Sequence, residues 1–212
     1  MIITRQKNFE DLLCSIDNGP VFVVGCSECA TLCHTGGEEE VLEIIRKFEK
    51  KNIEVTGSVI LDPACHFLND KRLLKSHKDE IDKAKKILVL ACGNGVQTVS
   101  QIIDSTDVIS GTDTLFLGEI KRLNDFQKMC SLCGECIQEE FGGFCPIARC
   151  PKEMLNGPCG GSINGKCEIN NELDCIWDII YSHLKKKGQL DKLKEIKKPK
   201  NWSKSIEMRR TL

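Results

Sequence analysis

Eight of the fourteen cysteines in this chain fall between Cys130 and Cys175, at spacings that suit metal binding. The stretch opens with Cys130, Cys133 and Cys136 as a C-x2-C-x2-C run. Such a run places three thiolates on one loop, and it forms the local half of a 4Fe–4S site whose fourth cysteine is often followed by proline. Cys145 and Cys150 are both followed by proline. We therefore predict a metal-folded module here.

The remaining cysteines of the stretch leave the type of metal open. They are Cys159, Cys167 and Cys175, and with the first five they suffice for two four-ligand sites. Zinc favours two separated C-x2-4-C knuckles, whereas closely spaced cysteines and Cys-Pro favour a 4Fe–4S cluster. One cluster together with one zinc ion is a third interpretation. Cys175 begins a helical pattern and could instead be a core residue.

Disulfides are the alternative use of many cysteines, and they belong to oxidising compartments. Residues 1–20 hold no apolar segment of the kind that directs secretion, and no run approaches the roughly 18 apolar residues of a membrane span. We therefore expect a cytoplasmic protein with no membrane span, whose clustered cysteines serve as metal ligands or redox thiols.

Charge is unevenly distributed along the 212 residues, although the net charge is only −1. Residues 185–212 contain eleven lysines and arginines against three acidic residues, so they carry about +8 and the rest about −9. This tail lacks a nucleic-acid motif, and the acidic remainder would repel phosphates. We predict no nucleic-acid binding and interpret the tail, with its Trp202, as a segment that docks on a partner or is disordered alone.

Hydrophobic patterning predicts an α/β fold with a small parallel sheet. Strands are expected at 21–24, 53–61 and 87–90, with short apolar runs at 107–110 and 114–117 as further candidates, and helices at 8–17, 38–50, 68–85, 96–103 and 172–195. We divide the chain into an α/β domain (1–120), a loop-rich, cysteine-rich metal module (121–172) and a C-terminal helix with a basic tail (173–212). Cys14, on the first helix, is interpreted as a small core residue.

Three cysteines follow three different predicted strands directly. Cys26, Cys65 and Cys92 must then project from one edge of the sheet, where open α/β folds bind their ligands. Cys29 and Cys33 belong to the first of these loops. The five thiols predict a further metal or cluster site, for which His34 and His66 are substitute ligands.

Two other motifs near this edge give weaker signals. Cys26 and Cys29 have the C-x-x-C spacing of thioredoxin-like proteins, but such motifs do not come with cysteines at two other strand ends. Gly93-Asn94-Gly95 begins like a dinucleotide-binding loop, but Thr98 stands where the third glycine belongs. We set both interpretations below metal binding.

Longer segments resemble the cysteine-rich small subunit of methylenetetrahydrofolate reductases from anaerobic bacteria. The resemblance is carried by CSLCGEC (130–136), FGGFCPIARCPKEMLNGPCGGSINGKCE (141–168), VFVVGCSECATLCHTGGEEEV (21–41) and ILVLACGNGVQTV (87–99). It implies a partner subunit, an FMN-bearing TIM barrel that binds and reduces the folate, and it leaves room for further electron-transfer subunits. It also implies one-carbon metabolism in the reductive acetyl-CoA pathway. Both iron–sulfur and zinc are attributed to this family.

No catalytic triad, paired carboxylate set or complete dinucleotide fingerprint occurs in the chain, so we predict a non-catalytic subunit. Our first hypothesis is an electron-transfer subunit with one to three 4Fe–4S clusters. Its sites would be one cluster on Cys130, Cys133, Cys136 and Cys145, a second metal on Cys150, Cys159, Cys167 and Cys175, and a third on the strand-end cysteines. The second hypothesis is a zinc-bound assembly module without a redox role. A thiol–disulfide enzyme using Cys26 and Cys29 ranks third.

Overall fold

The computed structural model describes residues 1–206, which divide into two compact units. The first unit comprises Met1–Phe116 and Arg122–Asn124, and the second comprises Leu117–Lys121 and the chain from Asp125 onward. The division falls within strand β6 (Thr112–Arg122). The cysteine-rich stretch and the C-terminal helix belong to the same unit.

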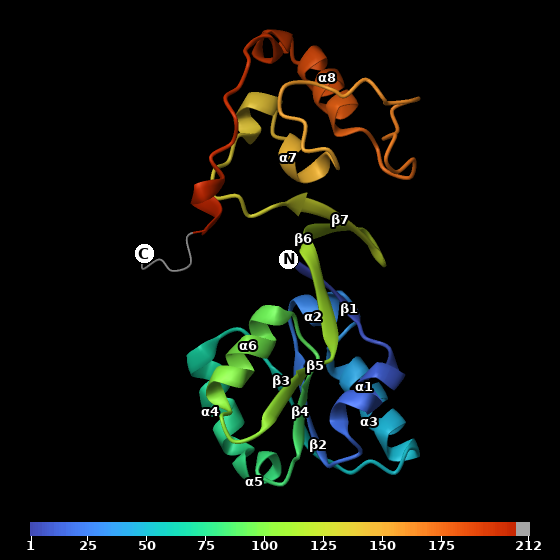
Figure 1. Cartoon of the computed structure of the whole chain (residues 1–212), viewed down its shortest axis with the longest axis vertical. Coiled ribbons are helices and arrows are strands. Elements are labelled where there is room, and N and C mark those ends of the chain that lie inside the picture. Colours follow the sequence, from blue (N-terminus) through green and yellow to red (C-terminus); the bar gives the residue numbers. More distant parts are fainter. Residues whose placement is uncertain (207–212) are drawn as a thin grey trace. The chain divides into compact units, whose positions relative to one another are not determined.

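The first unit is built on a four-stranded parallel sheet in the order β3-β2-β4-β5, so the predicted α/β class is confirmed (Figure 1). Its strands are β2 (Val21–Cys26), β3 (Val55–Leu61), β4 (Lys86–Val89) and β5 (Asp107–Ser110). Its helices are α1 (Phe9–Ile16), α2 (Cys29–Leu32), α3 (Glu38–Lys50), α4 (Phe67–Ser76), α5 (Lys78–Ile81) and α6 (Gly93–Ile102). A further strand, β1 (Ile2–Gln6), pairs with β6 in a sheet of order β1-β6-β7.

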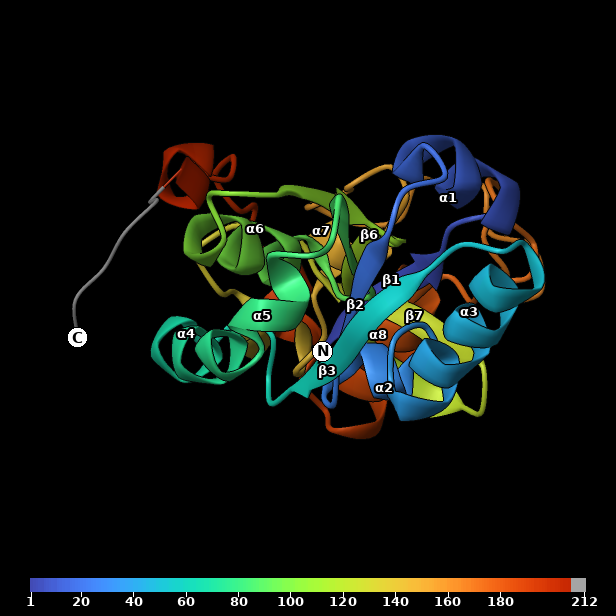
Figure 2. The same cartoon turned by 90° about the horizontal axis from the view of Figure 1, so that it is seen from below.

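Alternating residues of the buried strands point to two separate cores. Phe22 and Val24 face α4 and α6, whose Leu74 and Val99 lie in the same cluster. Leu12 and Ile16 of α1 and Val41, Ile44 and Phe48 of α3 cover the other face. Figure 2 shows α1 and α3 on one side of the sheet and α4, α5 and α6 on the other. A sheet buried on both faces explains why its strands are continuous apolar runs.

The predicted helices of this unit form, with one interruption. Helix α3 spans the predicted 38–50 and begins with three glutamates, of which Glu40 accepts a hydrogen bond from the Gly37 N–H at 2.8 Å. The helix predicted at 68–85 is broken at His77 into α4 and α5. The His77 ring nitrogen Nδ1 lies 2.7 Å from Glu80 Oε2 and joins the two pieces.

The second unit contains little regular structure. It holds β7 (Asp125–Cys130), α7 (Pro146–Arg149), α8 (Ile176–Lys186) and the short 3-10 helices η1 (Gln138–Phe141), η2 (Leu190–Lys194) and η3 (Trp202–Ile206). Its core is small and consists of Phe141, Cys150, Ile176, Trp177, Ile180 and Leu184. Phe141 and Trp177 meet edge to face, with ring centroids 5.6 Å apart.

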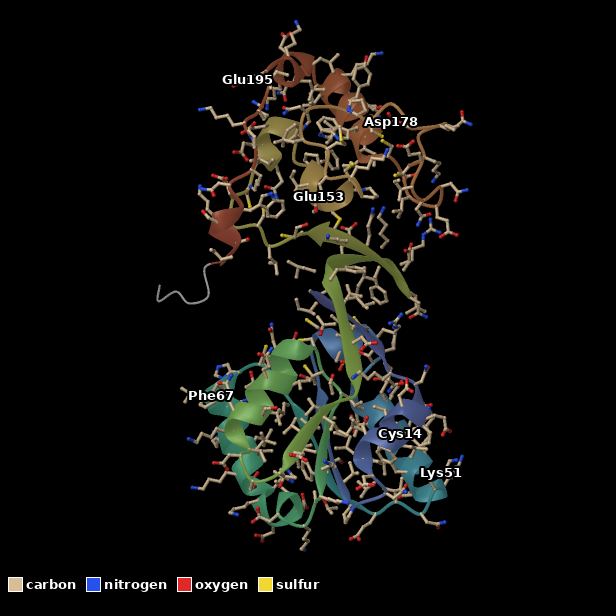
Figure 3. All side chains as sticks on the ribbon, in the orientation of Figure 1. Cys14, Lys51, Phe67, Glu153, Asp178 and Glu195 are labelled. Carbon is tan, nitrogen blue, oxygen red and sulfur yellow. The ribbon has the colours of Figure 1, made fainter. Side chains whose placement is uncertain are left out.

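Two sequence-based predictions were wrong in detail. Cys14 is exposed rather than buried, because the buried face of α1 is formed by Leu12 and Ile16 (Figure 3 labels Cys14). The predicted helix 172–195 is shorter: α8 ends at Lys186, and Gly188 follows with a φ of +66°. Glycine in the left-handed conformation just after a helix is a common C-terminal stop.

Among residues 1–206, no helix is long and apolar enough to cross a membrane.

Candidate metal centres

The carboxyl edge of the parallel sheet gathers cysteines from three strands, as the sequence predicts. Cys26 is the last residue of β2 and pairs in register with Leu61, the last residue of β3. Cys65 follows β3 by four residues, and Cys92 precedes α6 as its N-cap. Since parallel strands end at one edge, these side chains meet where open α/β sheets bind ligands.

The pKa of the Cys65 thiol is raised by burial and by neighbouring groups, which include three other cysteines. Burial is the main cause that raises the pKa of the Cys65 thiol. Neighbouring groups raise it further through their negative charge, and these are, in decreasing order, Cys92, Cys26, Asp70 and Cys29. Cys26, Cys29 and Cys92 therefore lie within electrostatic range of Cys65, which is itself exposed. Four sulfur ligands suit zinc or a 4Fe–4S cluster, and a bound cation would relieve this repulsion.

A buried carboxylate adds to the negative charge of the crevice. Asp70 is fully buried in the first turn of α4; its Oδ2 accepts the His66 N–H at 3.0 Å, and its Oδ1 has no hydrogen-bond partner. Burial raises the pKa of Asp70, and the hydrogen bond from His66 offsets part of that rise. An unpaired buried anion is costly, so the crevice as described lacks positive charge.

Cys33 and the two histidines make other contacts. The buried Cys33 thiol donates to the Ile2 carbonyl at 3.7 Å, while the Ile2 N–H donates to Cys29 Sγ at 3.4 Å. Cys33 is not among the groups that shift the pKa of Cys65. His66 Nδ1 accepts the Asn69 N–H at 3.3 Å, and His34 Nδ1 lies 3.8 Å from Glu40. Cys26, Cys29, Cys65 and Cys92 thus form the gathered set.

In the second unit, the C-x2-C-x2-C loop begins where β7 ends, at Cys130. Leu132 and Gly134 both have positive φ, of 54° and 74°, and turn the chain tightly between the cysteines. The Leu132 N–H donates to Cys130 Sγ at 3.3 Å, and the Cys133 thiol donates to the Glu135 carbonyl at 3.7 Å. Backbone N–H groups that point at sulfur are typical of cluster loops.

Cys145 is brought towards this loop by α7. It is the N-cap of α7, with Pro146 in the first helical turn, and α7 packs against β7, which carries Cys130. Proline suits this position because its fixed φ is already helical. The arrangement is consistent with Cys145 as the fourth cysteine of the set, without establishing that role.

The four cysteines of the second predicted set line a single cavity of about 20 Å³: Cys150, Cys159, Cys167 and Cys175. Backbone hydrogen bonds bring two of them together, because the Cys167 N–H donates to the Leu173 carbonyl at 2.9 Å and the Cys175 N–H to the Gly165 carbonyl at 2.7 Å. The Cys159 thiol lies 3.3 Å from Glu168 Oε1. A cavity needs roughly 10–15 Å³ to hold one water molecule, so this one is about that size with the side chains as they stand.

Two cations of the second unit each have one buried nitrogen atom without a hydrogen-bond partner. They are Arg149, at Nε, and Lys200, at Nζ. Arg149 stands between Cys145 and Cys150, and burial lowers its pKa. Buried cations are compensated by anions, and thiolates that carry a metal or cluster would provide them. The residues of this unit therefore fit a metal-bound thiolate group.

The cysteine side chains lie in the same regions, but they are not arranged as the ligands of a metal ion. Within residues 1–206, no group of three or more His, Cys, Asp or Glu side chains is arranged so that it could hold a metal ion. All fourteen cysteines are free rather than paired in disulfides. Side chains must therefore reorient when metal binds, which agrees with the general rule that few sites are preformed.

Sequence reasoning missed the charged residues around the cysteines. In the sequence, Asp70 has the position of an acidic residue in the first turn of a helix, which is usually exposed. Lys200 is one of several lysines in the basic tail. A carboxylate one helical turn after a predicted strand-end cysteine could have signalled Asp70. Nothing near Lys200 in the sequence indicates its burial.

These features define a cysteine-rich α/β protein that gathers free thiols both at a sheet edge and in a loop-rich unit. Residues 109–203 match a family model described as methylene-tetrahydrofolate reductase C terminal. The match covers all eight cysteines of the stretch 130–175 and less than half of the chain. This part of the chain is therefore similar to the C-terminal region of methylenetetrahydrofolate reductases. No curated protein and no solved structure gives a significant match.

Proposed function

We propose that this chain is the electron-transfer and assembly subunit of a methylenetetrahydrofolate reductase. In this proposal it passes electrons to an FMN-containing TIM-barrel subunit, which reduces 5,10-methylenetetrahydrofolate to 5-methyltetrahydrofolate. The family match over residues 109–203 supports the link to the enzyme. The observation that carries the electron-transfer role is the gathering of free cysteines at several places in one chain.

The chain's own residues would hold the redox groups and exclude solvent from them. When bound, a 4Fe–4S cluster supplies reversible one-electron transfer, which suits a flavin partner. Cys130, Cys133, Cys136 and Cys145 are the proposed ligands of the first cluster. The sheet-edge cysteines Cys26, Cys29, Cys65 and Cys92 are the proposed ligands of another, set on a rigid edge by the two cores of the first unit.

A zinc ion is the second candidate for the cavity lined by Cys150, Cys159, Cys167 and Cys175. Four cysteines around one cavity match the four-coordinate thiolate sites of structural zinc. A zinc ion would stabilise the fold of this unit without carrying electrons. Zinc at this cavity and clusters elsewhere are compatible; zinc at every site would make the chain a purely structural subunit.

The deciding experiment is elemental analysis of the chain co-expressed with the flavoprotein subunit and purified without oxygen. Iron and acid-labile sulfide in equal amounts, at four or more per chain, would support the relay. Zinc without sulfide would refute it and leave the assembly role. A matched variant, Cys150→Ser, would then remove zinc if zinc lies in the small cavity, while iron and sulfide would persist at the other sites.

A further inference from the structure

The end of the described chain crosses the second unit as a mostly irregular segment, residues 195–206, which we call the C-terminal strap (Figure 1, red; Glu195 is labelled in Figure 3). Asn156 fixes the strap near its start: its Nδ2 donates to the Lys197 carbonyl at 3.0 Å, and its Oδ1 accepts the Lys197 N–H at 2.7 Å. The Lys197 ammonium also lies 2.9 Å from Glu140. These contacts hold the strap in one register.

The far part of the strap lies directly on the C-x2-C-x2-C loop. Lys204 forms an ion pair with Glu135, which stands between Cys133 and Cys136. A Cβ added at Gly134 would lie 2.5 Å from the Lys204 carbonyl oxygen, so only glycine allows this approach. The Lys204 hydrogen bond is the largest cause that lowers the pKa of Glu135, and a hydrogen bond from the Asn201 backbone contributes to it.

Lys200 is the unusual residue of this contact. Its side chain is only 4% exposed, and its Nζ lies 3.9 Å from Glu135 Oε2. That separation is too long for a hydrogen bond, and Nζ has no other hydrogen-bond partner. The Ser131 hydroxyl, on the same loop, is also buried and unpartnered. The Lys200 ammonium is therefore held out of water beside the Glu135 carboxylate without forming a hydrogen bond within residues 1–206.

We propose that Lys200 is an electrostatic component of the redox site: it provides a buried positive charge beside the cluster on the Cys130–Cys136 loop and raises the reduction potential of that cluster. The proposal rests on the proposed function, because it requires a cluster at this loop. A 4Fe–4S cluster with four cysteines is an anion in both oxidation states, and reduction makes it more negative. A fixed cation nearby therefore favours the reduced form, and burial of Lys200 protects this effect from screening by salt.

The experiment compares lysine variants of the full chain, loaded with iron and sulfide without oxygen, by redox titration followed by electron paramagnetic resonance. The signal of this cluster is the one that Cys133→Ser abolishes. Lys200→Met should make the reduced form about tenfold less favoured, which is 59 mV for one electron. Lys200→Arg should restore most of the potential. The matched control is Lys204→Met. It removes a lysine whose side chain is 47% exposed and which pairs with the same Glu135. This variant should change the ratio of reduced to oxidised cluster less than twofold.

Acetylation of lysines, followed by mass spectrometry of the loaded wild-type chain, provides an independent measurement. Lys200 should be protected and Lys204 modified. An unchanged potential in Lys200→Met at full iron content, or rapid modification of Lys200, would overturn the proposal while leaving the relay intact. Absence of iron and sulfide from the wild-type chain would overturn the relay itself, and with it the role of Lys200.

Discussion

The two cysteine-rich regions differ in what holds them in place and in the charge that surrounds them. At the sheet edge of the first unit, Cys26 and Cys65 extend from strands with a large core on either face. In the second unit, loops carry the cysteines around a small core. The unpaired buried group is an anion, Asp70, in the first region and the cations Arg149 and Lys200 in the second. The atoms without a hydrogen bond thus belong to an anion in the first region and to cations in the second, where Glu135 lies 3.9 Å from Lys200 Nζ.

From this difference we expect that the proposed metals would contribute differently to the two regions. At the sheet edge, the strands position the thiols whether or not metal is present, so the fold determines the site. In the loops, few apolar contacts compensate for the conformational entropy of ordering the chain, so we expect that the proposed metal would help to determine the fold. Four predictions test this comparison, in order of decreasing effect.

Metal removal should have the largest effect, and it should separate the two units. Structural metal sites can contribute on the order of 10 kcal/mol to folding. Hydrogen exchange of the chelated chain should therefore show loss of protection across residues 130–175, while β2 and β4 stay protected. Equal loss of protection in both units would contradict the comparison, and a chain that keeps all its protection would show that neither site stabilises the fold.

Loss of one loop cysteine should remove one redox group. Cys133→Ser should abolish the visible absorbance of a single cluster and the reduction of the partner's flavin that depends on it. The matched control is Cys14→Ser, which changes an exposed cysteine on α1 and should alter neither. Full absorbance and flavin reduction in Cys133→Ser would show that Cys133 is not a ligand.

Gly134→Ala should detach the strap from the cysteine loop. The added Cβ would meet the Lys204 carbonyl, and the φ of +74° disfavours any residue but glycine, for a cost of about 2 kcal/mol or more. Acetylation of Lys200 should then become as fast as that of Lys204. Gly143→Ala is the control. Gly143 has a φ of +98°, but the space around its Cβ position is open. The Gly143→Ala substitution therefore strains the backbone without creating a clash. Equal Lys200 labelling in the two variants would show that the contact with Lys204 does not hold the strap.

Asp70→Asn should give the smallest effect, with opposite signs in the metal-free and metal-bound chains. Without metal, the variant removes an unpaired charge from the crevice and should raise the free energy of unfolding by about 1 kcal/mol, measured by urea denaturation. With metal, it removes an anion beside the thiolates and should speed metal loss to a chelator. A variant that is less stable in both states would show that Asp70 has a purely structural role.

The sequence predicts the sheet and its cysteine edge because both follow from local patterns. Apolar runs indicate buried strands, and parallel strands end at one edge of the sheet. The position of Cys26, Cys65 and Cys92 at that edge could therefore be predicted without knowing any distance. The grouping of Cys150, Cys159, Cys167 and Cys175 was a hypothesis about eight cysteines, and the cavity that they share was not visible in the spacing.

What the sequence could not predict depends on contacts between distant residues. Cys14 lies on a short amphipathic helix, where neighbouring positions differ in whether they face the core or the solvent. In α1 the buried positions are Leu12 and Ile16, and Cys14 faces the solvent. The basic tail was predicted to dock on a partner or to be disordered. Up to Ile206 it lies against the chain's own second unit, docking on a partner stays a prediction, and residues 207–212 are outside the described part. The burial of Lys200 arises from this long-range contact alone.

The contact between Glu135 and Lys204 also determines an order of events during synthesis. The two residues are 69 positions apart. At the usual rate of about 5–20 residues per second, the ribosome completes the cysteine loop several seconds before it makes the residue that covers it. A nascent chain therefore exposes the C-x2-C-x2-C loop at first, and the strap can cover it only after Lys204 has left the ribosome. Deletion of the strap would leave that early, open stage as the final state.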